Sequence, residues 1–117
     1  MTEGKAKKLL KSYRPTLWRK KALEASVGVQ NQSVKDCERS LAFIRDLVEQ
    51  LLDQKRVGDK LYWVIYITYM TEQQPKDVYE ALEKVTEAHE EIPRSSYFRL
   101  RKQALALLDQ ALGEMHS

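Results

Sequence analysis

The segment from residue 94 to residue 102 concentrates side chains that can bind a polyanion. It holds four cations, no acid, two serines and an aromatic pair. Guanidinium groups and hydroxyls donate hydrogen bonds to phosphate oxygens, and Arg is the commonest reader of guanine edges in the major groove of DNA. We expect Arg94 and Arg99 to reach base edges. The full set of expected DNA contacts is Arg94, Ser95, Ser96, Tyr97, Arg99, Arg101 and Lys102.

A second basic segment lies at the start of the chain. Residues 1–21 carry eight Lys or Arg residues against Glu3 alone, whereas residues 72–91 carry seven acids against two lysines. Such a segment is typical either of a contact with phosphates that carries no sequence information or of an ordinary solvated surface. The residues expected to make nonspecific phosphate contacts are Lys7, Lys8, Lys11, Arg14, Arg19, Lys20 and Lys21.

Residue types that perform catalysis or hold metals are sparse and poorly spaced. His89 and His116 are far apart and match no zinc-ligand spacing. Cys37 has no histidine near it in the sequence and falls on an apolar helical stripe. The sequence also lacks a glycine-rich loop that could hold a nucleotide. We therefore expect a binding protein that is not an enzyme and that uses no metal or cofactor.

Length and composition favour one small all-α domain, or one domain with an appended arm. The 117 residues include 43% hydrophobic and 32% charged residues but only four Gly and three Pro. One Cys cannot form an internal disulfide, and the longest apolar run, residues 61–70, is about half a membrane span. We expect a soluble cytoplasmic protein, associated with the nucleoid of a bacterial host.

The N-terminal region, residues 1–57, is predicted to contain three helices. A basic helix over 3–13 should be interrupted at Arg14–Pro15, and a second helix should open at Pro15. After a loop over 28–33, a capping box at Ser33 and Asp36 should start a long helix that Gly58 stops. This helix carries a heptad stripe, which packs either inside the domain or in a homodimer: Cys37, Leu41, Ile44, Val48 and Leu51.

The C-terminal region, residues 58–117, is predicted to be helical as well. Residues 59–70 favour a strand locally, but no second strand is available for pairing, so we expect a buried central helix capped by Asp59. A helix from Pro75 should bury Val78 and Leu82, and Ile92–Pro93 should end it. The last helix should start at Ser95 or Ser96 and stop at Gly113. Its inner face should hold Phe98 (or Tyr97), Leu100, Ala104, Leu107, Leu108, Ala111 and Leu112.

Residues 78–82 and 92–108 resemble the end of bacterial sigma factor region 4. They are more closely similar to the small sigma-like regulators of Gram-positive phages and prophages, the ArpU and RinA type. The similarity is carried by Ser95–Ser96, by the run Tyr97–Phe98–Arg99, and by the basic residue and Ala–Leu pair that follow. The resemblance implies a C-terminal helix-turn-helix and sequence-specific control of transcription. It also implies that the protein binds double-stranded DNA, with RNA polymerase as a possible further partner.

The spacing inside the resemblance departs from the usual motif. A helix-turn-helix turn usually has about 3–4 residues, whereas residues 83–94 separate the matching parts here. Either the first helix is extended or a loop is inserted. Two alternatives to the regulator stay open: a helical protein-interaction module that acts as an adaptor or inhibitor of a host factor, and a DNA-packaging protein like a small terminase subunit.

Overall fold

The computed structural model describes residues 4–54, 58–85 and 94–115, and within them every regular element is helical. The predicted all-α fold is therefore confirmed. The helices are α1 (Lys5–Lys11), α2 (Tyr13–Val27), α3 (Gln32–Glu49), η1 (Gln50–Asp53), α4 (Gly58–Ile65), η2 (Tyr66–Met70), α5 (Val78–Val85) and α6 (Arg94–Met115). One hydrophobic core joins them, with buried residues from Ala6 to Leu112, so the regions 1–57 and 58–117 share their interior.

The segment that favoured a strand locally is the central helix of the core. Leu61, Val64 and Ile65 have no exposed side-chain surface, and α4 continues directly into η2, a wider π-helical turn. Three half-buried aromatic rings pack against one another along the same helix: Tyr62 stacks on Tyr66, and Trp63 lies edge-on to both. A helix that is apolar on nearly all sides needs neighbours on all sides, and α1, α3, α5 and α6 supply them around α4–η2.

The first two helices meet earlier than their sequence predicts. The break falls at Ser12, whose backbone N–H donates to the carbonyl oxygen of Leu9, and not at Arg14–Pro15. Pro15 lies inside the first turn of α2. The N–H groups of a first turn have no partner within the helix, so the missing N–H of proline costs nothing there.

The start of α3 is also corrected by the structure. Asn31 is the N-cap, and its side chain accepts a hydrogen bond of 2.9 Å from the N–H of Ser33. The predicted capping box from Ser33 to Asp36 is therefore wrong by two residues. Gly28, with a φ of +86°, ends α2 and allows the chain to reverse toward Asn31.

The heptad stripe of α3 is used inside the chain. Each of its five residues is at most 5% exposed: Cys37, Leu41, Ile44, Val48 and Leu51. These side chains face α2 and the core, so they offer no surface to a second copy. Of the two alternatives for this stripe, the structure therefore shows packing inside the domain, and nothing in it supports the homodimer.

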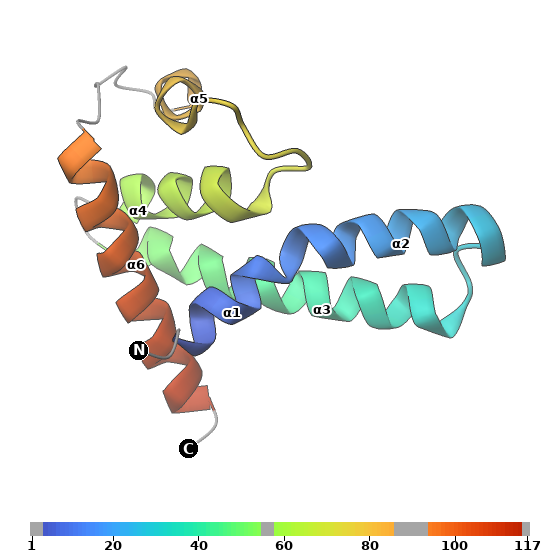
Figure 1. Ribbon diagram of the computed structural model, residues 1–117. Coiled ribbons are helices and arrows are strands. Elements are labelled where there is room, and N and C mark those ends of the chain that lie inside the picture. Colours follow the sequence, from blue (N-terminus) through green and yellow to red (C-terminus); the bar gives the residue numbers. More distant parts are fainter. Residues whose placement is uncertain (1–3, 55–57, 86–93, 116–117) are drawn as a thin grey trace.

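Figure 1 shows how the helices are arranged in space. The pair α2 and α3 projects to one side, while α6 runs along the opposite edge with α1 across its C-terminal half. The radius of gyration is 15.4 Å, larger than about 13 Å for a compact chain of this length. Among the described residues, no helix combines the length and apolarity that crossing a membrane needs.

Gly58 begins α4 where a side chain would not fit. A Cβ atom there would lie 2.7 Å from the carbonyl oxygen of Leu51 and 2.9 Å from that of Leu52. The glycine predicted as a helix stop is therefore the first residue of the next helix. Its lack of a side chain allows its backbone to lie close to the carbonyl groups of Leu51 and Leu52.

We expect Gly58→Ala to lower the free energy of unfolding by about 1–3 kcal/mol, because backbone atoms must move to admit the methyl group. Gly113→Ala is the matched control, since open space surrounds Gly113 in α6. That variant should raise stability by about 0.5–1 kcal/mol. Urea denaturation measures both values. Equal effects of the two substitutions would contradict the steric account.

Candidate functional site

The two basic segments, far apart in the sequence, lie side by side in the fold. Helix α1 packs on α6, and the N–H of Ala6 donates a 2.8 Å hydrogen bond to Oδ1 of Asp109. The carboxylate thereby satisfies one of the N–H groups that the start of α1 leaves unpaired. Gly4 precedes the helix at a point where a Cβ atom would collide with the Asp109 carboxylate. Backbone and carboxylate thus fix the register of α1 on α6.

Two hollows open along the line where α1 meets α6. The first, the Phe98 groove, measures about 490 Å³ and has an apolar floor of Phe98, Leu105 and Ala106. The second, the Arg14 hollow, measures about 430 Å³ and lies toward the start of α2. Lys7 and Arg101 line both hollows, so the hollows adjoin and share their cationic walls.

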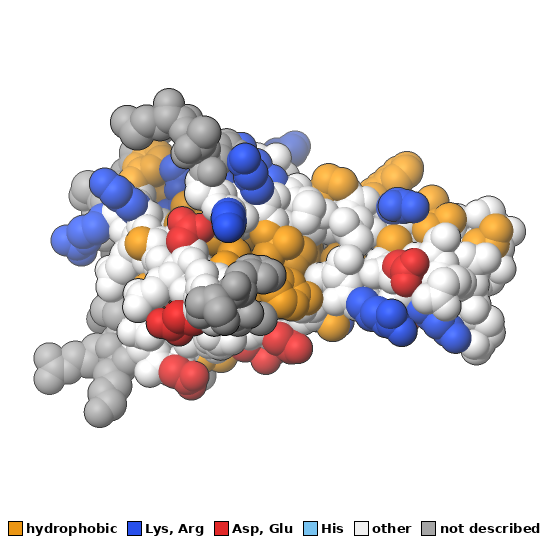
Figure 2. Space-filling view, turned by 90° about the horizontal axis from the view of Figure 1, so that it is seen from below, with side chains coloured by type: hydrophobic (Ala, Val, Ile, Leu, Met, Phe, Trp, Pro, Cys, Tyr) orange, Lys and Arg blue, Asp and Glu red, His pale blue; other side chains and the backbone are white. Residues whose placement is uncertain are grey.

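The surface around these hollows is strongly cationic. Lys102 adds a third cation to the Phe98 groove, and Lys11 and Arg14 add two more to the Arg14 hollow. Seen from below, the wider end of the molecule carries Lys and Arg side chains along its upper edge, with hydrophobic side chains exposed among them and several Asp and Glu side chains below (Figure 2). Adjacent cations raise the local positive potential, which attracts polyanions.

The two aromatic residues near the start of α6, Tyr97 and Phe98, differ in their exposure to solvent. Tyr97 is 4% exposed, whereas Phe98 is 45% exposed. The guanidinium carbon of Arg101 lies 4.9 Å from the ring centroid of Phe98 and 5.5 Å from that of Tyr97. A cation over an aromatic face is attracted to the ring electrons. The contact therefore holds Arg101 along the groove wall.

Tyr97 is an anchor of α6 and not a surface contact. Its hydroxyl oxygen lies 2.6 Å from Oγ1 of Thr68, and that Thr hydroxyl donates its one proton to the carbonyl oxygen of Val64. Tyr97 must therefore donate to Thr68, since a hydroxyl carries a single proton. Its ring also packs edge-on against Tyr79 of α5. Because the ring is buried, the expected contact of Tyr97 with DNA is wrong.

Arg14 binds the end of the central helix. Its guanidinium donates to the carbonyl oxygens of Ile67, Thr68 and Thr71 at 3.2, 2.9 and 2.9 Å, and to the hydroxyl of Thr71 at 2.9 Å. These are the acceptors that a helix end leaves unpaired. Partial burial lowers the pKa of Arg14 from its ordinary value, although Arg stays charged at any physiological pH. The expected role of Arg14 in phosphate contact is therefore replaced by a structural one.

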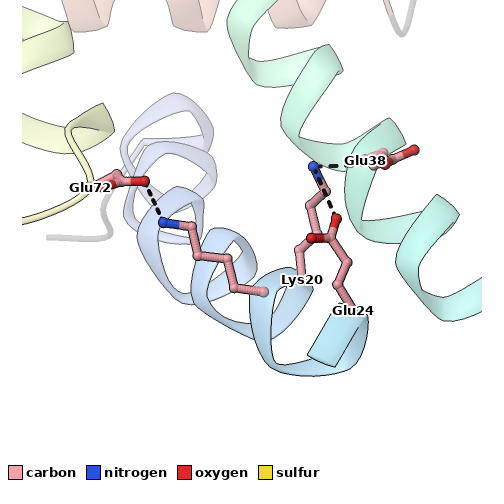
Figure 3. A network of polar contacts seen from close by, with 5 residues as sticks. Lys20, Glu24, Glu38 and Glu72 are labelled. Carbon is pink, nitrogen blue, oxygen red and sulfur yellow. Dashed lines mark hydrogen bonds and ion pairs between the residues drawn. The ribbon is translucent and has the colours of Figure 1, made fainter. Parts of the chain in front are cut away.

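Two further lysines of the expected phosphate contacts face acids. Nζ of Lys20 lies 3.6 Å from Oε1 of Glu24 and 3.7 Å from Oε1 of Glu38, and Lys21 pairs with Glu72 (Figure 3). Opposite charges at this distance lower the positive potential around both lysines. Neither lysine lines the hollows beside α6.

The other expected contact residues are distributed unevenly. Arg99 and Lys102 are exposed on α6, Lys8 is exposed on α1, Arg19 is exposed on α2, and Ser96 is half-buried. The side chains of Arg94 and Ser95 lie outside the part that the structure describes, and so does the connection over 86–93. The question of an extended helix or an inserted loop therefore falls outside the described residues. So do His89 and His116.

Sequence reasoning missed two residues of the site, Phe98 and Asp109. The register of α6 could have placed the first, because Tyr97 shares one helical stripe with Leu100 and Ala104, while Phe98 lies off it. The cap that Asp109 provides carries no local signal, since its partner is 103 positions away. Within the described residues, no three His, Cys, Asp or Glu side chains gather as metal ligands would.

Compared with known proteins, the chain matches no family model, no curated protein and no solved structure. The functional argument therefore stands on the geometry of the α1–α6 surface.

We expect Arg14→Ala to lower the free energy of unfolding by about 1.5–3 kcal/mol, because it strands the carbonyl groups that end η2. Arg19→Ala, an exposed change on the same helix, should stay within about 0.5 kcal/mol of the wild type. Thermal and urea unfolding measure both. If Arg14→Ala left stability unchanged and weakened polyanion binding instead, the phosphate role would be restored.

Proposed function

We propose that the chain binds double-stranded DNA through the surface that α1 and α6 share, and that it regulates transcription. The supporting observation is the convergence of cations from the two ends of the sequence, with Lys7 and Arg101 lining both hollows. A duplex presents closely spaced phosphates on both strands. Cations on two adjacent helices can therefore contact several phosphates at once, which a single anion does not allow.

The outward face of α6 suits the reading of bases. Arg99, Lys102 and Gln103 are exposed on it, and Ala106 continues the same face. Arg binds guanine in bidentate fashion, Gln binds adenine, and Ala can contact the thymine methyl group. Arg99, Lys102 and Gln103 lie in the N-terminal half of the long helix α6, which is the part that recognition helices insert into the major groove.

Helix α1 would then follow the phosphate backbone beside the groove. Lys7, Lys8 and Lys11 lie on this short helix, next to α6. Contacts of this kind fix the position of a protein on DNA without carrying sequence information. Each phosphate that they neutralise releases counterions, so binding should weaken steeply as salt rises.

A protein contact is the second candidate, and one observation favours it. Trp18 of α2 is 75% exposed, and Val27 and Val29 at the tip of the projecting pair are 52% and 59% exposed. Exposed apolar groups of this size often mark interaction surfaces. Since the α3 stripe is buried, such a contact would use α2 instead. An apolar contact responds little to salt, which separates it from DNA binding.

The test begins with selection of bound fragments from random duplex DNA, followed by affinity measurement on selected and unrelated sequences. Arg99→Ala should weaken binding to the selected sequence by about 1–3 kcal/mol and change binding to unrelated DNA much less. Lys102→Ala should weaken both alike and reduce the salt slope by about 1. Arg39→Ala, an exposed cation on α3, is the control and should change neither. No selected sequence, or equal effects of the three variants, would refute the proposal.

A further inference from the structure

The Phe98 groove has a chemistry that phosphate contact does not use. A surface that only holds a duplex backbone needs cations, yet this groove has a floor of Phe98, Leu105 and Ala106. Phe98 leaves 45% of its surface exposed. Exposed aromatic rings beside cations are the surfaces on which unpaired bases of nucleic acids stack.

We propose that the groove binds one unpaired nucleotide of a DNA strand, with its base on Phe98 and its phosphates on the surrounding cations. The inference rests on the proposed DNA binding and adds a substrate class to it. Lys7, Arg101 and Lys102 stand around the apolar floor, so the groove joins a planar apolar surface to positive charge. A nucleotide joins a planar base to negative charge in the same way.

The geometry around Phe98 supports stacking. Arg101 is held over the ring at 4.9 Å, and its planar guanidinium is a second surface on which a base can stack. The groove measures about 490 Å³, within the range of about 300–1,000 Å³ that pockets for small molecules occupy. Asp109 also lines the groove, and a carboxylate can accept a hydrogen bond from the amino group of a base.

The neighbouring hollow indicates a strand and not a free nucleotide. Lys7 and Arg101 continue from the Phe98 groove into the Arg14 hollow, where Lys11 follows. A free mononucleotide offers phosphate at one place only. A strand that leaves one base in the groove passes its next phosphates along this cationic line.

The experiment compares two duplexes of one sequence, fully paired or with one unpaired adenine in the middle, by fluorescence anisotropy. We expect the wild type to bind the bulged duplex about tenfold more tightly. Phe98→Ala should abolish this preference and leave the affinity for the paired duplex unchanged, while Phe98→Trp should keep it. Leu52→Ala is the matched control, because Leu52 is also 45% exposed but lines neither hollow.

Each other outcome counts against a stated claim. If both duplexes bind equally, or if Phe98→Ala and Leu52→Ala behave alike, the nucleotide site is refuted while DNA binding stands. If neither duplex binds, the proposed function and the inference fail together. Adenosine monophosphate that competes as well as the bulged strand would refute the strand as the source. Poly-glutamate that competes as well would assign the groove to an acidic protein segment and refute the nucleotide.

Discussion

Two cationic helices are held side by side in this protein, although like charges repel. Lys7 of α1 lines one hollow with Arg101 and Lys102 of α6, and Lys7 and Lys11 line the adjoining hollow with Arg101. Burial opposes the repulsion, because Leu10 of α1 and Leu108 of α6 are at most 1% exposed. Burying one such side chain contributes about 1.5–3 kcal/mol, whereas an exposed pair of charges changes stability by about 0.2–1 kcal/mol. Burial of the apolar side chains therefore outweighs the charge repulsion, and it keeps α1 beside α6.

The central helix supplies the frame on which this surface is built. At its C-terminal end, Arg14 binds the carbonyl oxygens of η2 and so fixes the start of α2. One turn earlier, Thr68 receives the hydroxyl proton of Tyr97 and fixes the start of α6. Arg14 binds backbone carbonyl groups and Tyr97 binds the Thr68 hydroxyl. These acceptors lie in η2 or directly after it, where a π-helical turn widens the backbone. Such turns often occur where a helix serves a further role, which here is to orient two other helices.

The positively charged residues of this fold have different structural roles. Arg14 ends a helix, Lys20 and Lys21 face acids, and Arg101 lies over an aromatic ring at the wall of a groove. Their charge alone predicts the same role for all of them. Lys7, Arg101 and Lys102 line a hollow together. The candidate site is thus smaller than the basic segments that predicted it, and it includes an aromatic residue that charge could not indicate.

Periodicity and composition by themselves determined the helical class, the central helix and the buried stripe of α3, because each follows from interactions between residues within a few turns. The helix over 59–70 needed one further step, the absence of any partner strand. Local signals located helix ends less well: the cap proved to be Asn31, and the first break proved to be Ser12.

The tertiary structure alone decided which cations meet, because the bonds that bring them together join positions far apart in the chain. Asp109 caps α1 across 103 positions, and Arg14 reaches Thr71 across 57. It also decided that the heptad stripe is buried inside the domain. The sequence pattern of a short apolar stripe is the same whether a second copy of the chain or α2 covers it. Local patterns fix what a segment can bury. Which segment covers it depends on the closure of the whole chain, and that closure created the groove between α1 and α6.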